Sequence, residues 1–535
     1  MQNTVPASAF AVELESYPRG GQESAQESAQ EPAQQSAQES APYADAVREY
    51  AQRNWLRLNV PGHAADHRSS SVGDLLGREM LALDFPPLLE GIDLGPAPTP
   101  LDRAQALAAE AWGARRTYFL TDGASEGNRI ACCALASLGL GDQLVVQRSV
   151  HSSVVDGLVL SGLRAGFVQP SIDAEMGLAH GVTAEALSAA LRANPDAAAA
   201  YVVTPSYFGA AADVRALAAA AHAADVPLIV DEAWGTHFGF HPELPANALS
   251  QGADLVISST HKLGGSLTQS AMLHLGDGRF ADRLEPLIDR AFRLFQSTSA
   301  SSILLASLDA ARRDLATGRG RIGQSIESSE IIRQAIREAG RFRIVSDGFS
   351  AFPDIVAADP LRIAIDTRAG GISGHEARRR LMNEHGVFVE VATSSAIVAV
   401  IGAGVVPAAG RFLDALHALP ATAAPEAVDA VDAVDAADAH PHTAAAPRLP
   451  APGPLALRPR EAFLRPGEFV PADRAVGRIS ADTLAAYPPG IPNVLPGEVV
   501  TAEVVAFLRQ TAASPAGHVR GAADPQVSRL RVVAE

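Results

Sequence analysis

The sequence contains a single lysine, Lys262, within the stretch STHKLGG at residues 259–265. The other 42 of its 43 basic residues are arginine, which serves as well as lysine at solvated or ion-paired positions. An amine differs from a guanidinium because it can lose its proton near neutral pH and attack a carbonyl carbon, which forms a Schiff base. We therefore predict that Lys262 is the covalent anchor of a cofactor, with a surface lysine that escaped replacement as the alternative.

A carboxylate, Asp231, ends the apolar run Leu228–Val230 and opens the turn EAWGTH. A charge at the end of a buried strand needs a partner, because an unpaired carboxylate is costly in a low-dielectric interior. A protonated pyridine nitrogen would suit Asp231. The alternative, an aspartate that caps the next helix, fits this residue equally well when it is viewed alone.

An anion-binding turn is indicated by TDGASEGN at residues 121–128, which follows a predicted strand and precedes a predicted helix at Arg129–Leu138. Backbone NH groups at a helix N-terminus, a serine hydroxyl and glycines that permit close approach together favour phosphate. The pattern is weak by itself, because many strand-to-helix turns share this composition. It also lacks the Gly-Lys-Ser/Thr ending of a Walker motif.

An aromatic base, His151, follows a predicted strand that ends near Gln147. Its imidazole can stack on a flat cofactor or move protons, whereas the alternative is a histidine that only starts a helix. The predicted site then combines an amine, a carboxylate, a phosphate-binding turn and an aromatic base. Pyridoxal 5′-phosphate (PLP), with its aldehyde, ring nitrogen, phosphate and flat face, requires this set of groups.

These side chains are positioned by short apolar runs that alternate with alanine-rich helical patterns from Thr117 to Leu275. Such alternation predicts an α/β fold with a mostly parallel sheet covered on both faces. Ligands of these sheets bind beyond the carboxyl ends of the strands, which is where the polar residues fall. We predict strands at Tyr118–Leu120, Gln143–Gln147, Ala200–Val203, Pro227–Val230 and Asp254–Ile257, and helices at Ala184–Arg192 and Val214–Ala224.

Composition limits the possible classes of protein. With 535 residues and 47% hydrophobic content, the chain is expected to form two or three globular domains. The net charge of −17 argues against a nucleic-acid partner. The sequence has neither a signal-like N-terminus nor a long apolar run, so we expect no membrane span and a cytoplasmic location. Adjacent Cys132 and Cys133 would form a strained disulfide and are interpreted as reduced, structural side chains.

Two segments of biased composition divide the chain. Residues 1–42 contain Gln-Glu-Ser-Ala units and predict a disordered tail, and residues 421–454 repeat Val-Asp-Ala and predict a linker. His440 and His442 in this linker have too few neighbouring ligands for a metal site, so we expect no metal. The remaining predicted parts are an N-terminal segment at 43–116, the major domain at 117–310, a smaller α/β domain at 311–420 with a helical stretch near Ala310–Ala339 and strands at Leu361–Ile365 and Ala396–Ile401, and a C-terminal α+β domain at 455–535.

Longer motifs resemble the bacterial ornithine/lysine/arginine decarboxylases, which are fold-type-I PLP enzymes. The resemblance covers most of the chain from about Tyr43, except the linker. The wing domain that precedes the large acid-induced members is absent, so assembly into large rings is not expected. The similar stretches are NVPGH at 59–63, HSSVVDGLVLSG at 151–162, VDEAWGTHFGFHPELP at 230–245, SSTHKLGGSLTQSAMLHL at 258–275, FQSTSASSILLASLDAAR at 295–312 and YPPGIPNVLPGE at 487–498.

The resemblance implies roles for individual residues. Lys262 would carry the cofactor, Asp231 would pair with the pyridine nitrogen, and His151 would stack on the ring. Trp234 would lie near the cofactor hydroxyl. The residues implied to surround the phosphate are Ala124, Ser125, Glu126, Ser259 and His261, joined by Thr298 or Ser299 from the partner subunit of a homodimer.

The implied reaction is PLP-dependent α-decarboxylation of a basic L-amino acid: lysine, ornithine or arginine would give CO2 and an amine that is a polyamine precursor. Glu498 is the candidate for binding the distal cationic group, with a solvated loop glutamate as the alternative. A fold-type-I aminotransferase is the closest rival, although Arg279 lies too far beyond Lys262 to match the arginine usual in that class. A catalytically silent PLP-binding module is a third possibility, supported by no basic patch.

Overall fold

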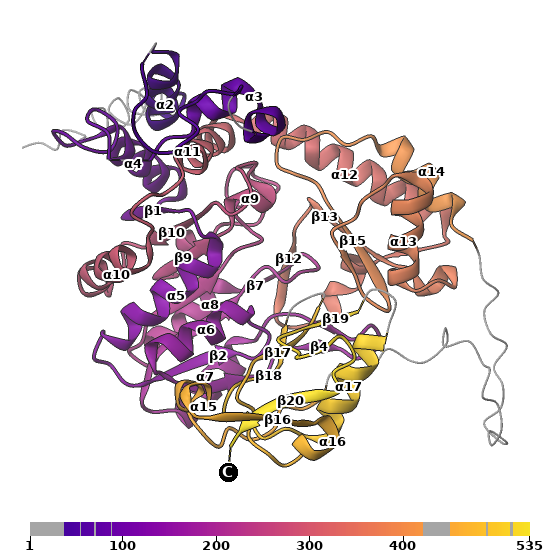
Figure 1. Ribbon diagram of the computed structural model, residues 1–535. Coiled ribbons are helices and arrows are strands. Elements are labelled where there is room, and N and C mark those ends of the chain that lie inside the picture. Colours follow the sequence, from indigo (N-terminus) through magenta and orange to yellow (C-terminus); the bar gives the residue numbers. More distant parts are fainter. Residues whose placement is uncertain are drawn as a thin grey trace, which may run out of the picture.

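The computed structural model describes residues 37–53, 55–68, 71–86, 88–420, 450–487, 491–513 and 517–534, and Figure 1 shows their arrangement. Most of the predicted tail lies outside these residues, as does most of the predicted linker, including His440 and His442. Among the described residues, none of the helices combines the length and the hydropathy needed to cross a membrane.

A seven-stranded sheet with the order β1-β10-β9-β8-β6-β2-β3 forms the centre of the major domain. The strands from β9 to β3 are parallel, whereas β10 runs antiparallel to both β1 and β9. The predicted α/β class with a mostly parallel sheet is therefore confirmed, although β10 and β3 were not predicted. The strands are β1 (Arg116–Leu120), β2 (Gln143–Gln147), β3 (Arg164–Val168), β6 (Ala197–Val203), β8 (Leu228–Asp231), β9 (Leu255–Ser258) and β10 (Ala271–Leu275).

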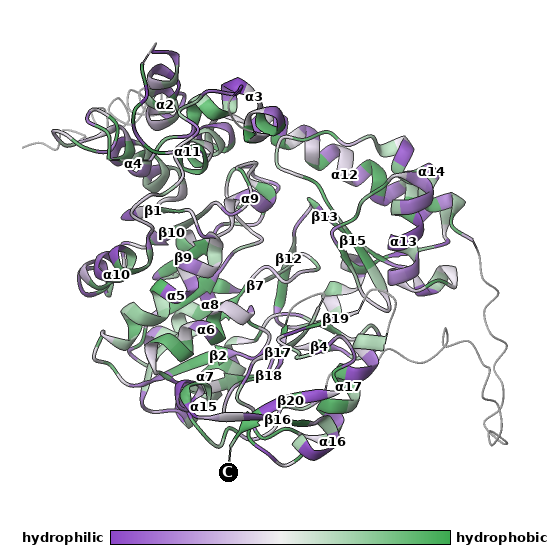
Figure 2. Cartoon of the chain, in the orientation of Figure 1, coloured by the Kyte–Doolittle hydropathy of each residue, from purple (hydrophilic) through white to green (hydrophobic). Residues whose placement is uncertain are grey.

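Helices cover both faces of this sheet. Successive residues of a strand point to opposite faces, and apolar side chains on each face are buried against helices. Leu144 and Val146 of β2 pack into one buried cluster, and Val145 between them packs into another. The first cluster contains α5 (Gly123–Ala136), α6 (Ser152–Ser161) and α10 (Ala281–Phe295), and the second contains α7 (Ala184–Ala193) and α8 (Val214–Ala223). Figure 2 shows the apolar residues concentrated on the central strands, with hydrophilic residues on outer helices such as α13 and α14.

Local sequence signals set where these helices begin. The Thr183 side chain accepts the NH of Ala186 and starts α7, and the Asp213 side chain accepts the NH of Ala216 and starts α8. Such caps satisfy NH groups that the first helical turn leaves free. The predicted helices at these two places are therefore confirmed to within one residue.

An N-terminal helical layer packs on α11 (Ser302–Thr317) and contains α2 (Pro42–Gln52), α3 (Ser71–Leu83) and α4 (Pro100–Trp112). Asp309 of α11 accepts the backbone NH groups of Tyr43 and Ala44 at 2.9 and 3.2 Å. The same carboxylate pairs with Arg312, and both side chains are fully buried. This pair ties α2 to the major domain.

The smaller domain contains a four-stranded antiparallel sheet with the order β11-β13-β15-β14. The predicted single helical stretch near Ala310–Ala339 is two helices, since α11 ends at Thr317 and Gly318 precedes α12. Strand β12 (Ile355–Ala358) pairs with β7 (Ala210–Ala212) of the major domain. The other elements are α12 (Arg319–Ala339), β11 (Arg343–Ile344), β13 (Arg362–Asp366), α13 (Gly374–His385), β14 (Val391–Ala392), β15 (Ala396–Val400) and α14 (Ala409–Ala418).

The C-terminal domain has its own buried cluster, built around Leu484, Val505 and Leu530. Helix α15 packs against α6 of the major domain, near the start of β2, where Arg458 pairs with Asp142 at 3.0 Å. The elements of this domain are α15 (Pro459–Leu464), β16 (Gly467–Pro471), α16 (Ala472–Ala475), β17 (Leu484–Tyr487), β18 (Ile491–Val494), α17 (Ala502–Ala513), β19 (His518–Arg520) and β20 (Arg529–Val533).

Candidate active site

The structure places the predicted chemical groups at one edge of the central sheet. Asp231 is the last residue of β8, and Lys262 lies in the short helix α9 (Thr260–Leu263), which directly follows β9. His151 caps the N-terminus of α6, which follows β2. The carboxyl ends of parallel strands meet at the same edge, so all three side chains come from the side of the sheet where ligands bind.

Lys262 lies against the indole ring of Trp234, with its Nζ 4.0 Å from the ring centroid. Burial lowers the pKa of Lys262 to about 8; the Asp231 and Glu390 carboxylates oppose this shift, whereas the Arg362 guanidinium adds to it. Among the described contacts, no hydrogen bond or ion pair engages Nζ. A substantial fraction of this amine is therefore neutral near physiological pH, as a nucleophile requires.

Asp231 is buried and accepts two hydrogen bonds. Asn128 Nδ2 donates to Oδ2 at 3.1 Å, and the backbone NH of Ala233 donates to Oδ1 at 3.1 Å. Burial raises the pKa of Asp231, while the Lys262 charge and these hydrogen bonds act in the opposite direction. A buried carboxylate with two donors but no directly bonded cation can accept a charged N–H group from a ligand.

His151 is held by its own helix, because its Nδ1 accepts the backbone NH of Ser153 at 3.2 Å. Burial, together with the nearby Lys262 and Arg520 cations, lowers the pKa of His151 to about 4. The imidazole is therefore neutral at physiological pH. A neutral imidazole can stack on the flat face of a ligand without adding a positive charge to the site.

The phosphate-binding turn begins α5 earlier than predicted, at Gly123 rather than Arg129. Ala124 and Ser125 occupy its first turn, where NH groups have no partner within the helix. The Glu126 carboxylate folds back and accepts the backbone NH of Asp122 at 3.0 Å. Glu126 therefore suits a phosphate only through its own backbone NH, because its side chain would repel the ligand.

Ser259 and His261 flank the site from the α9 side. Ser259 is buried and precedes the first residue of α9. Nδ1 of His261 lies 2.9 Å from the carbonyl oxygen of Ser270, which directly precedes β10. Because a carbonyl only accepts, this contact places the ring hydrogen on Nδ1 and fixes the orientation of the imidazole.

The arrangement fits PLP on an observation independent of motifs. The buried indole Nε1 of Trp234 has no hydrogen-bond partner among the described residues. A buried donor without an acceptor is costly, and a ligand oxygen beside the Lys262 amine would satisfy it. The hydroxyl next to the PLP aldehyde supplies such an oxygen.

Two predicted site residues lie apart from this group of side chains. Thr298 is exposed on the segment between α10 and α11, and among the described residues its side chain makes no hydrogen bond to a site residue. Glu498 is buried, and its carboxylate lies 3.0 Å from Nη2 of Arg148 while it also accepts the NH of Leu495. Burial raises the pKa of Glu498 to about 7 against the effect of Arg148. Since the chain already engages this carboxylate, the geometry does not support Glu498 as the acceptor of a substrate cation.

Sequence reasoning missed three residues of the site. Asn128 holds Asp231, and nothing in its sequence context identified that contact. Arg362 of β13 reaches across from the smaller domain, where its guanidinium lies 4.2 Å from the Trp234 ring centroid and donates to the Trp234 carbonyl at 3.1 Å. Glu390 is an exposed carboxylate whose charge acts on Lys262, His261 and Arg362. The only sequence signal for Glu390 was its position directly before β14.

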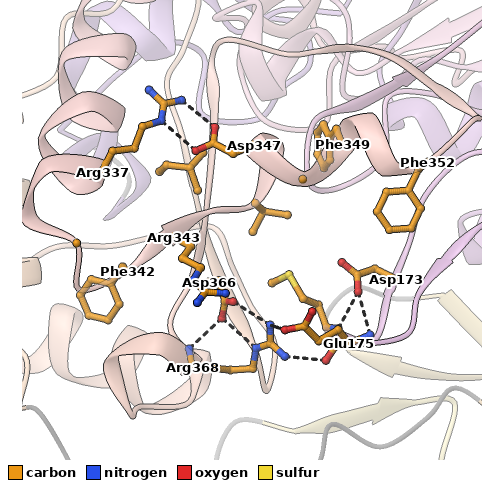
Figure 3. Close-up of a pocket in the computed structure, with 15 residues that line it drawn as sticks. Asp173, Glu175, Arg337, Phe342, Arg343, Asp347, Phe349, Phe352, Asp366 and Arg368 are labelled. Carbon is orange, nitrogen blue, oxygen red and sulfur yellow. Dashed lines mark hydrogen bonds and ion pairs between the residues drawn. The ribbon is translucent and has the colours of Figure 1, made fainter.

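A separate pocket of about 420 Å³ lies between the smaller domain and the hairpin of β4 (Ile172–Asp173) and β5 (Leu178–Ala179) (Figure 3). Its charged side chains mostly neutralise one another. Arg337 pairs with Asp347, and Arg368 pairs with Asp366 and Glu175. None of the predicted site residues lines this pocket.

Known proteins match the chain over most of its length. Residues 41–351 match the Orn/Lys/Arg decarboxylase major domain, and residues 454–516 match the C-terminal domain of the same family. An arginine decarboxylase of Bacillus anthracis is 33% identical over 92% of this chain and 97% of its own length. One of Halalkalibacterium halodurans is 34% identical over 92% of this chain and 98% of its own length. The solved structure of lysine decarboxylase A from Pseudomonas aeruginosa shares the fold, with a TM-score of 0.73, 22% identity and coverage of 95% of this chain and 82% of that one.

Proposed function

Because the chain belongs to the Orn/Lys/Arg decarboxylase family and is a PLP-dependent decarboxylase of a basic amino acid, we propose that its substrate is L-arginine. The products would be CO2 and agmatine. The observation that carries this choice is the similarity to proteins named arginine decarboxylase, at 33% and 34% identity over nearly their whole lengths. The family assignment favours decarboxylation over the aminotransferase alternative.

The proposed roles of the site residues follow from their contacts. When bound, PLP supplies an electron sink that accepts the electron pair left at Cα as the carboxyl group departs. Lys262 would hold the cofactor through Nζ and, with its pKa of about 8, would return a proton to Cα. The Asp231 carboxylate would keep the ring nitrogen protonated, and His151 would lie on the ring face. Trp234 Nε1 would donate to the hydroxyl oxygen.

Glu390 is the proposed acceptor of the substrate guanidinium. Its carboxylate is exposed, and its charge acts on Lys262 and on Arg362. No hydrogen bond or ion pair of the Glu390 side chain occurs among the described residues, so this carboxylate is available to a ligand. Arginine pairs well with a carboxylate because its planar guanidinium can donate two parallel hydrogen bonds.

The proposed active unit is a homodimer in which Thr298 of one subunit reaches the phosphate of the other. Exposed apolar side chains support this assembly, since Leu56, Leu58 and Leu75 are 84%, 88% and 81% exposed. Leu56 and Leu58 lie two positions apart in the chain, and large exposed apolar patches usually mark an interface. Thr298 is likewise exposed, as a residue that serves a partner subunit must be in the single chain.

The proposed division of the chain assigns PLP binding to residues 117–310, with the smaller domain at 311–420 and the C-terminal domain at 455–535. Separate buried clusters in the major and C-terminal parts support it. The proposed location is the cytoplasm, which the two free thiols of Cys132 and Cys133 support. The proposed product, a polyamine precursor, would be used there.

The decisive experiment supplies purified, PLP-saturated protein with L-arginine, L-lysine or L-ornithine at equal concentration. Evolved CO2 and the amine product are quantified for each substrate. We expect agmatine to form with a kcat/KM at least about tenfold above the values for the other two, which corresponds to roughly 1.4 kcal/mol of selectivity. A higher value for lysine or ornithine would overturn the arginine assignment, and glutamate formation from 2-oxoglutarate would overturn decarboxylation.

A further inference from the structure

A chain of buried hydrogen bonds connects four elements beneath the candidate site. Asn128, in the second turn of α5, stands at its centre. Its Nδ2 lies 2.9 Å from Ser153 Oγ of α6 and 3.1 Å from Asp231 Oδ2 of β8. Its Oδ1 lies 2.7 Å from the hydroxyl of Tyr201 on β6. All four side chains are buried, with Asn128 only 1% exposed.

The direction of each hydrogen bond is determined by the groups at the ends of the chain. The Tyr201 hydroxyl retains its proton, because burial raises its pKa well above the ordinary value. It therefore donates to Asn128, which must accept through Oδ1. In this orientation, the two hydrogens on Nδ2 point toward Asp231 Oδ2 and Ser153 Oγ. The Asn128 amide nitrogen therefore donates one hydrogen bond to each of these oxygens.

The chain continues from Ser153 to His151. Because Ser153 Oγ accepts from Asn128, its own hydrogen is free to point at His151 Nδ1, which lies 2.8 Å away. The backbone NH of Ser153 points at the same nitrogen. Two donors at Nδ1 require that this nitrogen carry no hydrogen, so the neutral ring carries its hydrogen on Nε2.

We propose that Asn128 is a positioning residue that acts on Asp231 and His151 at once. It holds the Asp231 carboxylate ionised and fixed in orientation, and through Ser153 it selects the Nε2–H form of His151. This proposal rests on the proposed function, in which Asp231 pairs with the pyridine nitrogen of PLP and His151 stacks on the face of the PLP ring. A directional network of this kind also keeps the site from reorganising when the ligand binds.

The test compares three PLP-loaded variants with the wild type. Asn128→Asp replaces the donor that faces Asp231 by a carboxylate, and Asn128→Ala removes it. Tyr201→Phe keeps the amide but removes the group that orients it. PLP affinity is measured by quenching of tryptophan fluorescence, and the pH dependence of the cofactor absorption band is recorded between pH 5 and 10.

We expect Asn128→Asp and Asn128→Ala to weaken PLP binding by about 10- to 100-fold, because a hydrogen bond to a charged group contributes that much to an equilibrium constant. The absorption band should also change its pH dependence, since Asp231 would no longer be held ionised. Tyr201→Phe should weaken binding less, by up to about tenfold, because it removes a neutral hydrogen bond.

Asn194→Ala is the matched control. Asn194 also uses its amide in two hydrogen bonds, to Gln143 at 2.6 Å and to the Ala190 carbonyl at 2.7 Å, but it lies at the opposite end of the strands, where α7 ends. Its replacement should leave PLP affinity and the absorption band unchanged. Circular dichroism confirms that each variant is folded.

Asp231→Asn separates this inference from the proposed function. If Asp231→Asn weakens PLP binding while folded Asn128→Asp and Asn128→Ala bind PLP and absorb as the wild type does, Asn128 has no positioning role. If Asp231→Asn also behaves as the wild type does, the role of Asp231 itself is wrong.

Discussion

At the scale of single residues, the site combines groups that burial has shifted away from their ordinary charge states. Lys262 and His151 both have lowered pKa values, mainly because desolvation disfavours a positive charge. Burial raises the pKa of Asp231, because desolvation disfavours its negative charge. Perturbed titratable groups that gather at one sheet edge are typical of catalytic sites.

Lys262→Arg tests whether an amine is required. The variant keeps a positive charge beside Trp234, so we expect the fold and the melting temperature to be retained. Decarboxylation should fall at least about 100-fold, since an arginine can neither bond to an aldehyde nor return a proton efficiently. Mass spectrometry after borohydride reduction checks the cause, because only the wild type should carry a cofactor adduct.

The pH dependence of cofactor attachment tests the lowered pKa of Lys262. The neutral amine is the reactive form, so in dialysed protein the attachment rate should rise with pH and level off above about 8. The same shift makes the folded state release this proton more readily than the unfolded state. Stability from this group is therefore present above the ordinary value of 10.5 and is lost as pH falls through about 8. Stopped-flow absorbance measures the rate, and a midpoint near 10.5 would contradict the assignment.

Glu390→Gln tests the proposed substrate contact. The change removes a charge but preserves shape, so we expect KM for arginine to rise by about 10-fold or more with a small effect on kcat, as loss of uniform binding predicts. Steady-state kinetics with arginine provide the measurement. Glu384→Gln, which changes an exposed glutamate of α13, is the control and should leave KM unchanged. Equal effects of both variants would remove Glu390 from the site.

At the scale of elements, the C-terminal domain braces the segment that carries His151. Arg148 of the major domain donates to the carbonyls of Pro492 and Asn493 and pairs with Glu498. On the other side of His151, Arg520 of β19 donates to Ser152 Oγ at 2.7 Å. The end of the motif YPPGIPNVLPGE is therefore a docking surface for Arg148.

Glu498→Gln tests this docking contact. It leaves the buried Arg148 guanidinium without its counter-charge, which should destabilise the protein by about 3–5 kcal/mol. The midpoint of thermal unfolding should fall accordingly. Glu468→Gln removes a partly exposed pair with Arg478 and should cost at most about 1 kcal/mol. If both variants lowered the unfolding midpoint by a similar amount, the Arg148–Glu498 pair would stabilise the protein no more than the partly exposed Arg478–Glu468 pair does.

The sequence predicted the parallel strands and the residues that follow them, because apolar runs and turn residues are local signals. Strand β10 was missed since it runs antiparallel and follows the lysine loop without a helix between them. Contacts such as that of Asn128 with Asp231 join residues 103 positions apart in the chain, and only the fold brings them together. The contact of Glu498 with Arg148 could not be predicted either, because the two residues lie 350 positions apart in the chain.

At the scale of the whole molecule, the smaller domain contributes side-chain and backbone contacts to the site, at Trp234 and at the end of α9. Arg362 contacts Trp234 and also donates to the Tyr207 carbonyl at 2.8 Å. The NH of Ala403 donates to the carbonyl of Leu263, at the end of the lysine helix, at 2.9 Å. These contacts explain why residues distant in sequence affect the Lys262 amine.

The proposed homodimer is tested with Leu56→Glu combined with Leu58→Glu. Two charges on an apolar interface should prevent association, so the apparent mass in light scattering should fall from two chains to one, and activity should fall with it. Val356→Glu changes an exposed apolar residue of the smaller domain and should leave the mass unchanged. A wild type that is monomeric and fully active would contradict the proposal.

The half-buried position of the single lysine has a practical consequence for labelling. Acylating reagents that modify ε-amino groups can reach only one side chain in this protein. In the apoenzyme, a fluorescent ester should therefore label Lys262 stoichiometrically, in addition to the α-amino group, and saturation with vitamin B6 phosphate should block the labelling of Lys262. Trypsin would cut after lysine only at Lys262 and after arginine elsewhere, and acylation of Lys262 should block that single cut.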